Sequence, residues 1–276
     1  MTVNKQKKIA VVNDITGFGR CSVAVALPII SAMKVQCCPL PTAILSSHTG
    51  FKNFYFDDYT PRMKAYINNW KELNLQFDGI CTGFLGSKEQ IDIVIEFIEN
   101  FKTKATMVIV DPVMGDHGKL YSTYTEEMCE EMKRLIKYAD VMTPNLTEAC
   151  RLLDMPYPER LLNTGELLNI AKELCKKGPN KIVITGLQYN GNIHNFIYES
   201  GNAYTTIETK KIGEDRSGTG DIFTSIVAAD IVKGVEFVTA VKKATAFISK
   251  AIDYTAKIGT PITDGICFEE YLTELQ

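Results

Sequence analysis

The sequence has no surplus of basic residues, no Cys-x-x-Cys pair and no long hydrophobic run. Its 30 Lys and Arg residues are balanced by 33 Asp and Glu residues, so that the net charge is −3. A chain without a basic excess is not expected to bind nucleic acid or an anionic membrane surface. None of the eight cysteines forms a Cys-x-x-Cys pair, which argues against a zinc site and suits a reducing compartment. Because no apolar run approaches the length of a membrane span, we expect a cytoplasmic protein.

A dinucleotide fingerprint is also absent. The loop after the first hydrophobic segment contains Gly17 and Gly19, but Ser22 stands where the third glycine would be. The glycines of that fingerprint let the backbone approach a pyrophosphate and let a helix pack closely on a strand. NAD binding is therefore not expected from this loop.

Hydrophobic segments alternate with helical patterns along most of the chain. Strands are expected at 8–13, 35–42, 77–81, 106–110, 140–142 and 181–185, the second of them as an edge or irregular strand because it contains Pro39 and Pro41. Helices are expected at 22–33, 59–70, 88–101, 125–137, 146–153, 166–177, 220–233 and 236–255. Such alternation is typical of an α/β fold with a parallel sheet and right-handed crossovers. Residues 193–198 and 203–210 are predicted to form an antiparallel pair. No linker or repeat divides the sequence, so we expect a single domain over residues 1–276.

Polar motifs follow several of the expected strands. They are Asn13-Asp14, Gly83-Phe84-Leu85-Gly86, Asp111-Pro-Val-Met-Gly-Asp116, Thr143-Pro-Asn-Leu-Thr-Glu148 and Thr185-Gly186. Open parallel sheets bind ligands beyond the carboxyl ends of their strands. The motifs therefore predict a ring of loops around one crevice.

The segment Gly218-Thr219-Gly220-Asp221 directly precedes an apolar helical pattern. The first N–H groups of a helix have no partner within it, and the helix dipole adds positive charge there. Glycines let a bulky anion approach the backbone, so a phosphate-binding site is predicted at this helix start. A carboxylate at position 221 would repel a phosphate unless it faces a group that must lose a proton. A plain helix start, with Asp221 favoured by the dipole alone, is the alternative.

Oxygen-bearing side chains at the strand ends suggest a magnesium site. Asp111, Asp116, Asn145 and Glu148 offer the oxygen atoms that Mg²⁺ prefers, and Mg²⁺ is usually held by one or two carboxylates together with substrate phosphates. Combined with Asp221 and the glycine-rich helix start, this set fits phosphoryl transfer. Taken singly, Asp111 or Glu148 could equally cap a helix or a turn.

These motifs resemble those of the ribokinase-like superfamily. Gly218-Thr-Gly-Asp221 followed by Ile-Phe is similar to its C-terminal signature. The motifs at 111–116 and 143–148 resemble the branch that holds pyridoxal kinases and hydroxymethylpyrimidine kinases. Pro41-Thr-Ala-Ile-Leu-Ser-Ser-His-Thr-Gly50 favours pyridoxal kinase within that branch. The resemblance spans residue 9 to about residue 250, and it implies a three-layer fold with a central, mostly parallel sheet, flanking helices and a small β flap.

The resemblance implies a role for each matching residue. Asp221 is similar to the general base for the substrate hydroxymethyl group. The residues expected to form the anion hole for the migrating phosphoryl group are Gly218, Thr219 and Gly220. Those expected around Mg²⁺, largely through water, are Asp116, Glu148 and Thr143. Those expected to support the nucleotide or a cation are Asp111, Asn145, Thr185 and Gly186. Those expected to contact the substrate ring or its pocket are Asp14, His48, Thr49 and Phe84.

Two positions depart from the family pattern. Asn13-Asp14 stands where many pyridoxal kinases carry Ser, and Phe84 stands where many carry Tyr. Both changes alter the wall of the expected substrate pocket. A carboxylate at position 14 could pair with a protonated ring nitrogen or with an aminomethyl group, which favours pyridoxamine.

The expected activity is phosphorylation of the 5′-hydroxymethyl group of vitamin B6 vitamers in pyridoxal phosphate salvage. ATP is the expected co-substrate, Mg²⁺ the expected metal, K⁺ a candidate monovalent cation and a homodimer the expected assembly. A hydroxymethylpyrimidine kinase of thiamine synthesis is the first alternative, because it differs only in its ring contacts. A non-catalytic vitamer or nucleotide binder is the second, although intact Asp221, Asp116 and Glu148 speak against it.

Overall fold

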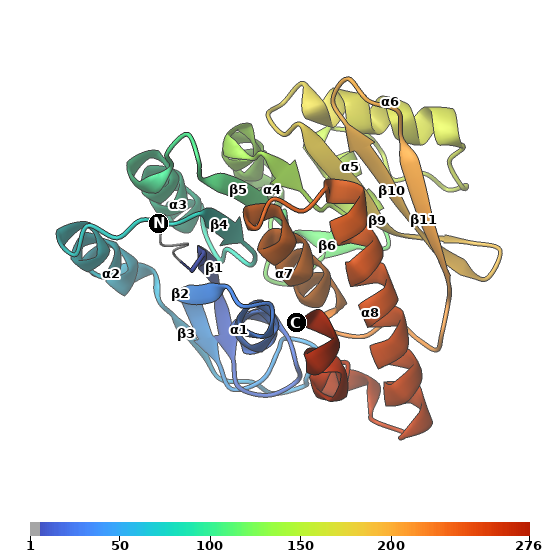
Figure 1. The fold of residues 1–276 in the computed structure, drawn as a ribbon, viewed down its shortest axis with the longest axis horizontal. Helices are drawn as coiled ribbons and strands as arrows, with labels where there is room; N and C mark the ends of the chain where they lie inside the picture. The colour runs from blue at the N-terminus through green and yellow to red at the C-terminus, as the bar shows by residue number, and fades with distance from the viewer. Residues whose placement is uncertain (1–5) are drawn as a thin grey trace, which may run out of the picture.

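The computed structural model describes residues 6–276, and a nine-stranded sheet forms its centre (Figure 1). The strand order is β11-β10-β9-β8-β5-β4-β1-β2-β3. The parallel strands are β1 (Lys8–Thr16), β2 (Gln36–Leu45), β4 (Gly79–Thr82), β5 (Met107–Val110), β8 (Val141–Met142) and β9 (Lys181–Tyr189). The antiparallel strands at the two edges are β3 (Phe56–Asp58), β10 (Asn192–Glu199) and β11 (Thr205–Lys210). The prediction of a mostly parallel α/β sheet is thus confirmed.

Helices cover both faces of this sheet and complete the three predicted layers. One face carries α2 (Thr60–Glu72), α3 (Lys88–Phe101), α4 (Glu126–Leu135), α5 (Leu146–Leu152) and α6 (Thr164–Cys175). The other carries α1 (Ser22–Ala32), α7 (Thr219–Val232) and α8 (Phe237–Lys257). Successive residues of a strand point to opposite faces. Accordingly Ala10 and Val12 join the first core, whereas Ile9 and Val11 join the second.

Helix α7 is apolar on all sides because it is the central helix of its layer. Every residue from Ile222 to Val232 is buried. A helix that is hydrophobic all round needs cover on every side, and α7 receives it from the sheet, from α1 and from α8 (Figure 1). This packing holds the start of α7 at the carboxyl ends of the parallel strands.

Three local features differ from the sequence-based expectation. Strand β1 continues past Asn13, because a register shift between Asn13 and Ile15 lets it stay paired with β2 as far as Thr16. Asp116 lies in a separate hairpin of β6 (Gly115–Asp116) and β7 (Lys119–Leu120), which was not predicted. The short edge strand β3, which pairs with the end of β2, was not among the predicted strands.

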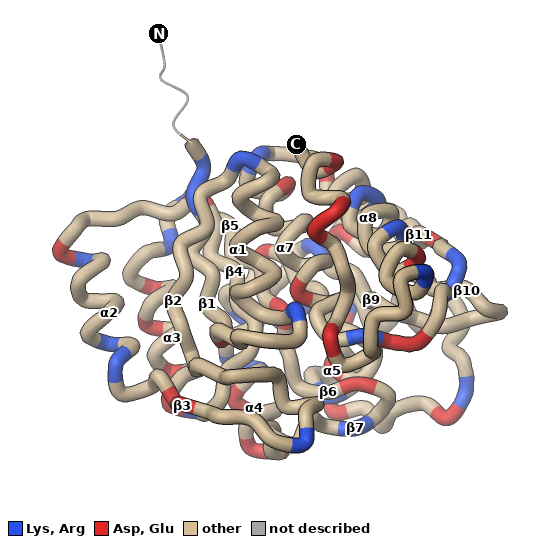
Figure 2. The backbone as a smooth tube through the Cα atoms, turned by 90° about the horizontal axis from the view of Figure 1, so that it is seen from below, with Lys and Arg blue, Asp and Glu red and all other residues tan. Residues whose placement is uncertain are grey.

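Lys and Arg residues are interspersed with Asp and Glu residues along the backbone (Figure 2), as the nearly balanced composition predicts. Over residues 6–276, helices that combine the length and the apolar character needed to cross a membrane are absent.

Candidate active site

A cleft of about 1540 Å³ opens along the carboxyl ends of the parallel strands. Typical small-molecule sites measure roughly 300–1000 Å³, so this cleft has room for two ligands side by side. All residues that the sequence predicted for the site line it: Asp14, His48, Thr49, Phe84, Asp111, Asp116, Thr143, Asn145, Glu148, Thr185, Gly186, Gly218, Thr219, Gly220 and Asp221. Segments up to two hundred residues apart in the sequence therefore meet in one place.

The start of α7 forms one wall of the cleft. Gly218 has a left-handed backbone with φ of 81°, and a Cβ added there would lie 1.9 Å from the carbonyl oxygen of Arg20. No side chain fits this position, so the glycine is required by both conformation and space. The Thr219 hydroxyl donates to the Arg216 carbonyl at 2.8 Å, which fixes the turn entering the helix. Gly218, Thr219 and Gly220 all line the cleft, so the predicted anion site at this helix start is open to a ligand.

Asp221, in the first turn of α7, is held by Asn13 of β1. The Asn13 Nδ2 group donates to Asp221 Oδ1 at 3.1 Å. The Oδ1 atom of Asn13 accepts the N–H groups of Asp14 at 3.0 Å and Phe84 at 2.9 Å, so the side-chain amide of Asn13 cannot rotate freely. A Cβ at Gly83 would lie 2.5 Å from the Asn13 side chain, which explains the glycine there. Asn13 was not among the residues to which the sequence analysis gave a role in the site. Its polar side chain at the end of an apolar strand was the feature that could have indicated one.

The carboxyl group of Asp221 is poised to accept a proton near neutral pH. Burial raises its pKa to about 6, and the N–H of Ser22 and the amide of Asn13 oppose that rise. Burial, and then the charge of Asp221, raise the pKa of neighbouring Asp111 to about 7. A general base works best when its pKa lies near the operating pH. The position and the raised pKa of Asp221 thus suit the general-base role that the resemblance implies, which stays a prediction.

Asp111 and Thr143 belong to a second polar cluster behind this base. Thr224 Oγ1 donates to Asp111 Oδ2 at 3.1 Å and lies 2.9 Å from Thr143 Oγ1. The Thr143 side chain is buried against this pair. Its hydroxyl is therefore engaged by Thr224, the residue that also donates to Asp111.

Glu148 and Asn145 form a capping box at the start of α5. The Asn145 side chain accepts the Glu148 N–H at 3.0 Å, and Glu148 Oε2 accepts the Asn145 N–H at 2.8 Å. Glu148 Oε1 accepts the N–H of Met114 at 3.1 Å. The helix-capping alternative considered for Glu148 is thus part of its structural role. Because a carboxylate has about four lone-pair sites, it still has acceptor capacity for a water molecule.

The acidic residues fit a magnesium ion only if the substrate phosphates and water complete its shell. Among residues 6–276, no group of three or more His, Cys, Asp or Glu side chains is placed to hold a metal by itself. Mg²⁺ commonly uses one or two carboxylates, several waters and phosphate oxygens. Asp116, which is exposed in the β6–β7 hairpin, and buried Glu148 meet that weaker requirement.

Thr185 and Gly186 lie beside the start of α5. Thr185 forms a parallel bridge with Asn145, and its N–H donates to the Pro144 carbonyl at 2.9 Å. Gly186 has φ of 70°, and its N–H donates to Asn195 Oδ1 at 3.1 Å. This amide is engaged within the protein, so a nucleotide contact at Gly186 would need another atom.

His48 closes the opposite end of the cleft. Its Nδ1 atom accepts the N–H of Gly50 at 3.1 Å, so the proton resides on Nε2, which faces the Thr263 carbonyl at 2.7 Å. The imidazole packs 4.7 Å from the Phe51 ring. With both nitrogens used within the protein, the ring presents its face or edge to a ligand. Neighbouring Thr49 is exposed in the same loop.

Asp14 adds a buried carboxylate to this end of the cleft. It is 5% exposed, and Thr16 Oγ1 donates to its Oδ2 atom at 2.5 Å. Burial raises its pKa, while hydrogen bonds from Ser22 and Thr16 oppose that rise. Phe84, half-buried nearby, supplies an apolar wall. This end can therefore hold a flat, partly apolar ligand that carries a hydrogen-bond donor.

The fold and the polar cleft define a kinase of the ribokinase-like superfamily. More specifically, the chain belongs to the phosphomethylpyrimidine kinase family, whose model matches residues 27–264. The predicted recognition of this superfamily and of the kinase class is confirmed by these comparisons.

Solved structures of relatives match nearly the whole chain. A protein of Bacteroides thetaiotaomicron, provisionally described as a phosphomethylpyrimidine kinase, is 41% identical with a TM-score of 0.96, covering 100% of this chain and 96% of that one. A second crystal form, with pyridoxal, gives 41% identity and a TM-score of 0.94 over 98% and 96% of the two chains. Pyridoxal kinase from Lactobacillus plantarum is 25% identical with a TM-score of 0.90, over 98% and 97%.

A curated relative comes from thiamine synthesis. The chloroplast thiamine biosynthetic bifunctional enzyme of Arabidopsis thaliana is 26% identical over 238 residues, or 84% of this chain. The chain spans 44% of the length of that enzyme. Relatives concerned with B6 vitamers and with thiamine thus both occur, and the family alone does not choose between their substrates.

Proposed function

We propose that the protein transfers a phosphoryl group from ATP to the 5′-hydroxymethyl group of a vitamin B6 vitamer. The observation that carries this proposal is the placement of Asp221, held by Asn13 at 3.1 Å, at the start of α7 in a cleft with room for two ligands. The Bacteroides relative crystallised with pyridoxal supports a B6 vitamer as the acceptor.

In the proposed reaction, the substrate hydroxyl loses its proton to Asp221 as its oxygen bonds to the terminal phosphorus of ATP. The bond between that phosphorus and the bridging oxygen breaks, and ADP leaves with the electron pair. The N–H groups at the start of α7 stabilise charge on the transferred group. Bound Mg²⁺, placed near Asp116 and Glu148, would neutralise phosphate charge. Positioning by Asn13 and general-base help from Asp221 account for roughly 10²–10⁴-fold of the rate.

Phosphorylation of hydroxymethylpyrimidine is the second candidate, favoured by the family match and by the thiamine-synthesis relative. Its acceptor carries the same hydroxymethyl group on a different ring, so the same base and helix start would serve. Dependence on K⁺, a homodimeric state and a cytoplasmic location stay predictions that follow from the resemblance.

The test is an ATP-consumption assay with Mg²⁺ on the purified protein, using pyridoxal, pyridoxine, pyridoxamine and hydroxymethylpyrimidine as acceptors. Turnover of a B6 vitamer that is lost in Asp221→Asn would support the proposal. Turnover of hydroxymethylpyrimidine alone would move the protein to thiamine synthesis. Ligand binding without any turnover would instead support the non-catalytic binder.

A further inference from the structure

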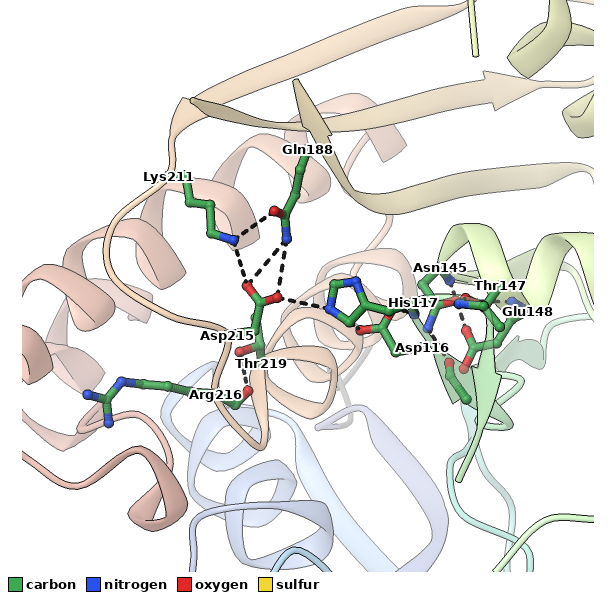
Figure 3. Close-up of polar contacts among 12 residues, drawn as sticks. Asp116, His117, Asn145, Thr147, Glu148, Gln188, Lys211, Asp215, Arg216 and Thr219 are labelled. Carbon is green, nitrogen blue, oxygen red and sulfur yellow. Dashed lines mark hydrogen bonds and ion pairs between the residues drawn. The ribbon is translucent and has the colours of Figure 1, made fainter. Parts of the chain in front are cut away.

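Three hydrogen-bond donors converge on the carboxylate of Asp215, in the loop that precedes α7 (Figure 3). His117 Nε2 lies 3.0 Å from its Oδ2 atom, and Gln188 Nε2 lies 3.2 Å from the same oxygen. Lys211 Nζ lies 3.4 Å from Oδ1 and donates to Gln188 Oε1 at 2.7 Å. Because an ionised carboxylate only accepts hydrogen bonds, His117 carries its proton on the nitrogen that faces Asp215.

The donors come from three separate parts of the fold. His117 lies in the turn between β6 and β7, Gln188 lies in β9, and Lys211 lies just after β11. The carboxylate of Asp215 and a phosphate group both present oxygen acceptors. Three donors that surround the carboxylate could therefore also surround a phosphate. All of them, and Asp215, line the same cleft as the start of α7.

The neighbouring arginine does not take part in this arrangement. The Arg216 guanidinium donates to the carbonyl oxygens of Pro261 at 2.8 Å and Thr260 at 2.9 Å, so it points away from the donors (Figure 3). Lys211 and Arg216 are both cationic residues of the segment between β11 and α7. The structure separates them, because Lys211 faces the cleft and Arg216 secures the segment after α8.

Asp215 is weakly held and can be displaced. The side chain of Asp215 is 52% exposed, and that of His117 is 62% exposed. Exposed ion pairs contribute only about 0.2–1 kcal/mol. The loop is bounded by Gly213 with φ of 61° and Gly218 with φ of 81°, conformations that glycine adopts without strain. An incoming polyanion would repel the Asp215 carboxylate and could bind the same donors, which are His117, Gln188 and Lys211.

We propose that His117, Gln188 and Lys211 form a subsite for the terminal phosphates of the nucleotide, and that the carboxylate of Asp215 competes with those phosphates for it. The inference rests on the proposed function, since it assumes that a nucleoside triphosphate enters the cleft. It assigns the loop before α7 a second role, as an internal competitor that lowers the affinity for ATP.

The experiment is isothermal titration calorimetry on the full chain with two probes, AMP and the non-hydrolysable ATP analogue AMP-PNP, in the presence of Mg²⁺. Asp215→Asn keeps the size of the side chain but removes its charge. Glu208→Gln is the matched control, because Glu208 is an exposed carboxylate in β11, three residues before Lys211, and is not among the residues that line the cleft. Lys211→Met removes one donor and keeps the length of the side chain.

Asp215→Asn is expected to bind AMP-PNP about 3- to 10-fold more tightly than the wild type, because a like charge and a competing ion pair are gone. AMP lacks the terminal phosphates, so its affinity should not change in any variant. Lys211→Met is expected to weaken AMP-PNP binding by a similar factor, and Glu208→Gln to leave it unchanged.

An unchanged or weaker affinity of Asp215→Asn for AMP-PNP would overturn the inference. An equal gain in Glu208→Gln would also overturn it, because the effect would then reflect the overall charge of this region. The ATP-consumption assay with the four acceptors, run on the wild type, distinguishes a failure of this inference from a failure of the proposed function. A protein that turns over a vitamer but shows no Asp215 effect loses only the inference, whereas one with neither turnover nor nucleotide binding loses both.

Discussion

Replacing Asp221 with Asn should make the protein more stable and almost inactive at the same time. The structure raises the pKa of Asp221 from 3.8 to about 6 through burial. At about 1.36 kcal/mol per pKa unit, holding this group ionised in the fold costs up to about 3 kcal/mol. The amide carries no charge, but its hydrogen bonds with Asn13 and the Ser22 N–H are weaker by about 1–2 kcal/mol. The net expectation is a gain of about 1–2 kcal/mol in the free energy of unfolding at pH 8.

The sign of the pH dependence follows from the direction of the shift. When folding raises the pKa of a carboxyl group, the group stabilises the folded state fully at a pH below its pKa in the unfolded chain. This contribution is lost as the pH rises through its pKa in the folded protein. The stability gain of Asp221→Asn should therefore be largest at pH 8 and should shrink towards pH 5. Removing the charge also relieves Asp111, whose pKa is raised partly by Asp221.

The assays are thermal unfolding at pH 5 and pH 8, and steady-state ATP consumption with the best acceptor. The variant should lose at least about 10²-fold in kcat, while nucleotide affinity stays close to that of the wild type. Asp253→Asn, on the exposed side of α8, is the control and should change neither property. Near-native turnover would remove Asp221 from the mechanism, and a Tm that falls at pH 8 would refute the electrostatic reasoning.

Three further predictions test the surroundings of this base. Asn13→Ala should lower kcat by about 10-fold or more and shift the acid limb of the pH–rate profile upward, since Asn13 lowers the pKa of Asp221; a profile that keeps its midpoint would count against a positioning role. Gly218→Ala should destabilise the fold by about 2 kcal/mol or more, because of the positive φ and the 1.9 Å approach to Arg20; denaturant unfolding measures this, and a wild-type midpoint would disprove it. Asp14→Asn should lower kcat/KM for pyridoxamine more than for pyridoxine, because only the former carries a cationic amine; equal losses for both vitamers would show that Asp14 does not select the substrate.

The sequence was informative about this site because strand ends are local features. Alternating apolar segments predict parallel strands, and the carboxyl ends of parallel strands share one edge of a sheet. Residues as distant as Asp14, Asp116 and Asp221 could therefore be assigned to one cleft without knowledge of the strand order. The glycine-rich helix start at 218–220 is likewise a local feature, although part of the reason for glycine at position 218 is the remote carbonyl of Arg20, 1.9 Å from an added Cβ.

Contacts across the fold were beyond such reasoning. The bond between Asn13 and Asp221 joins residues 208 positions apart, and it depends on where a register shift falls in β1. The two ring nitrogens of His48 are engaged by backbone groups, one of them after residue 260, which no local pattern signals.

The sequence by itself predicted the class of fold and the polar residues at the strand ends, because these follow from periodicity, and its resemblance to the ribokinase-like superfamily added His48, Thr49 and Phe84 to the expected lining of the cleft. Only the tertiary structure decided what each of these residues does. It showed that Glu148 caps a helix, that Arg216 secures the segment after α8, and that Asp215 faces Lys211 and His117. The physical reason is that the direction of a polar side chain depends on which partners the packed elements bring within hydrogen-bond distance, and those partners are remote in the sequence.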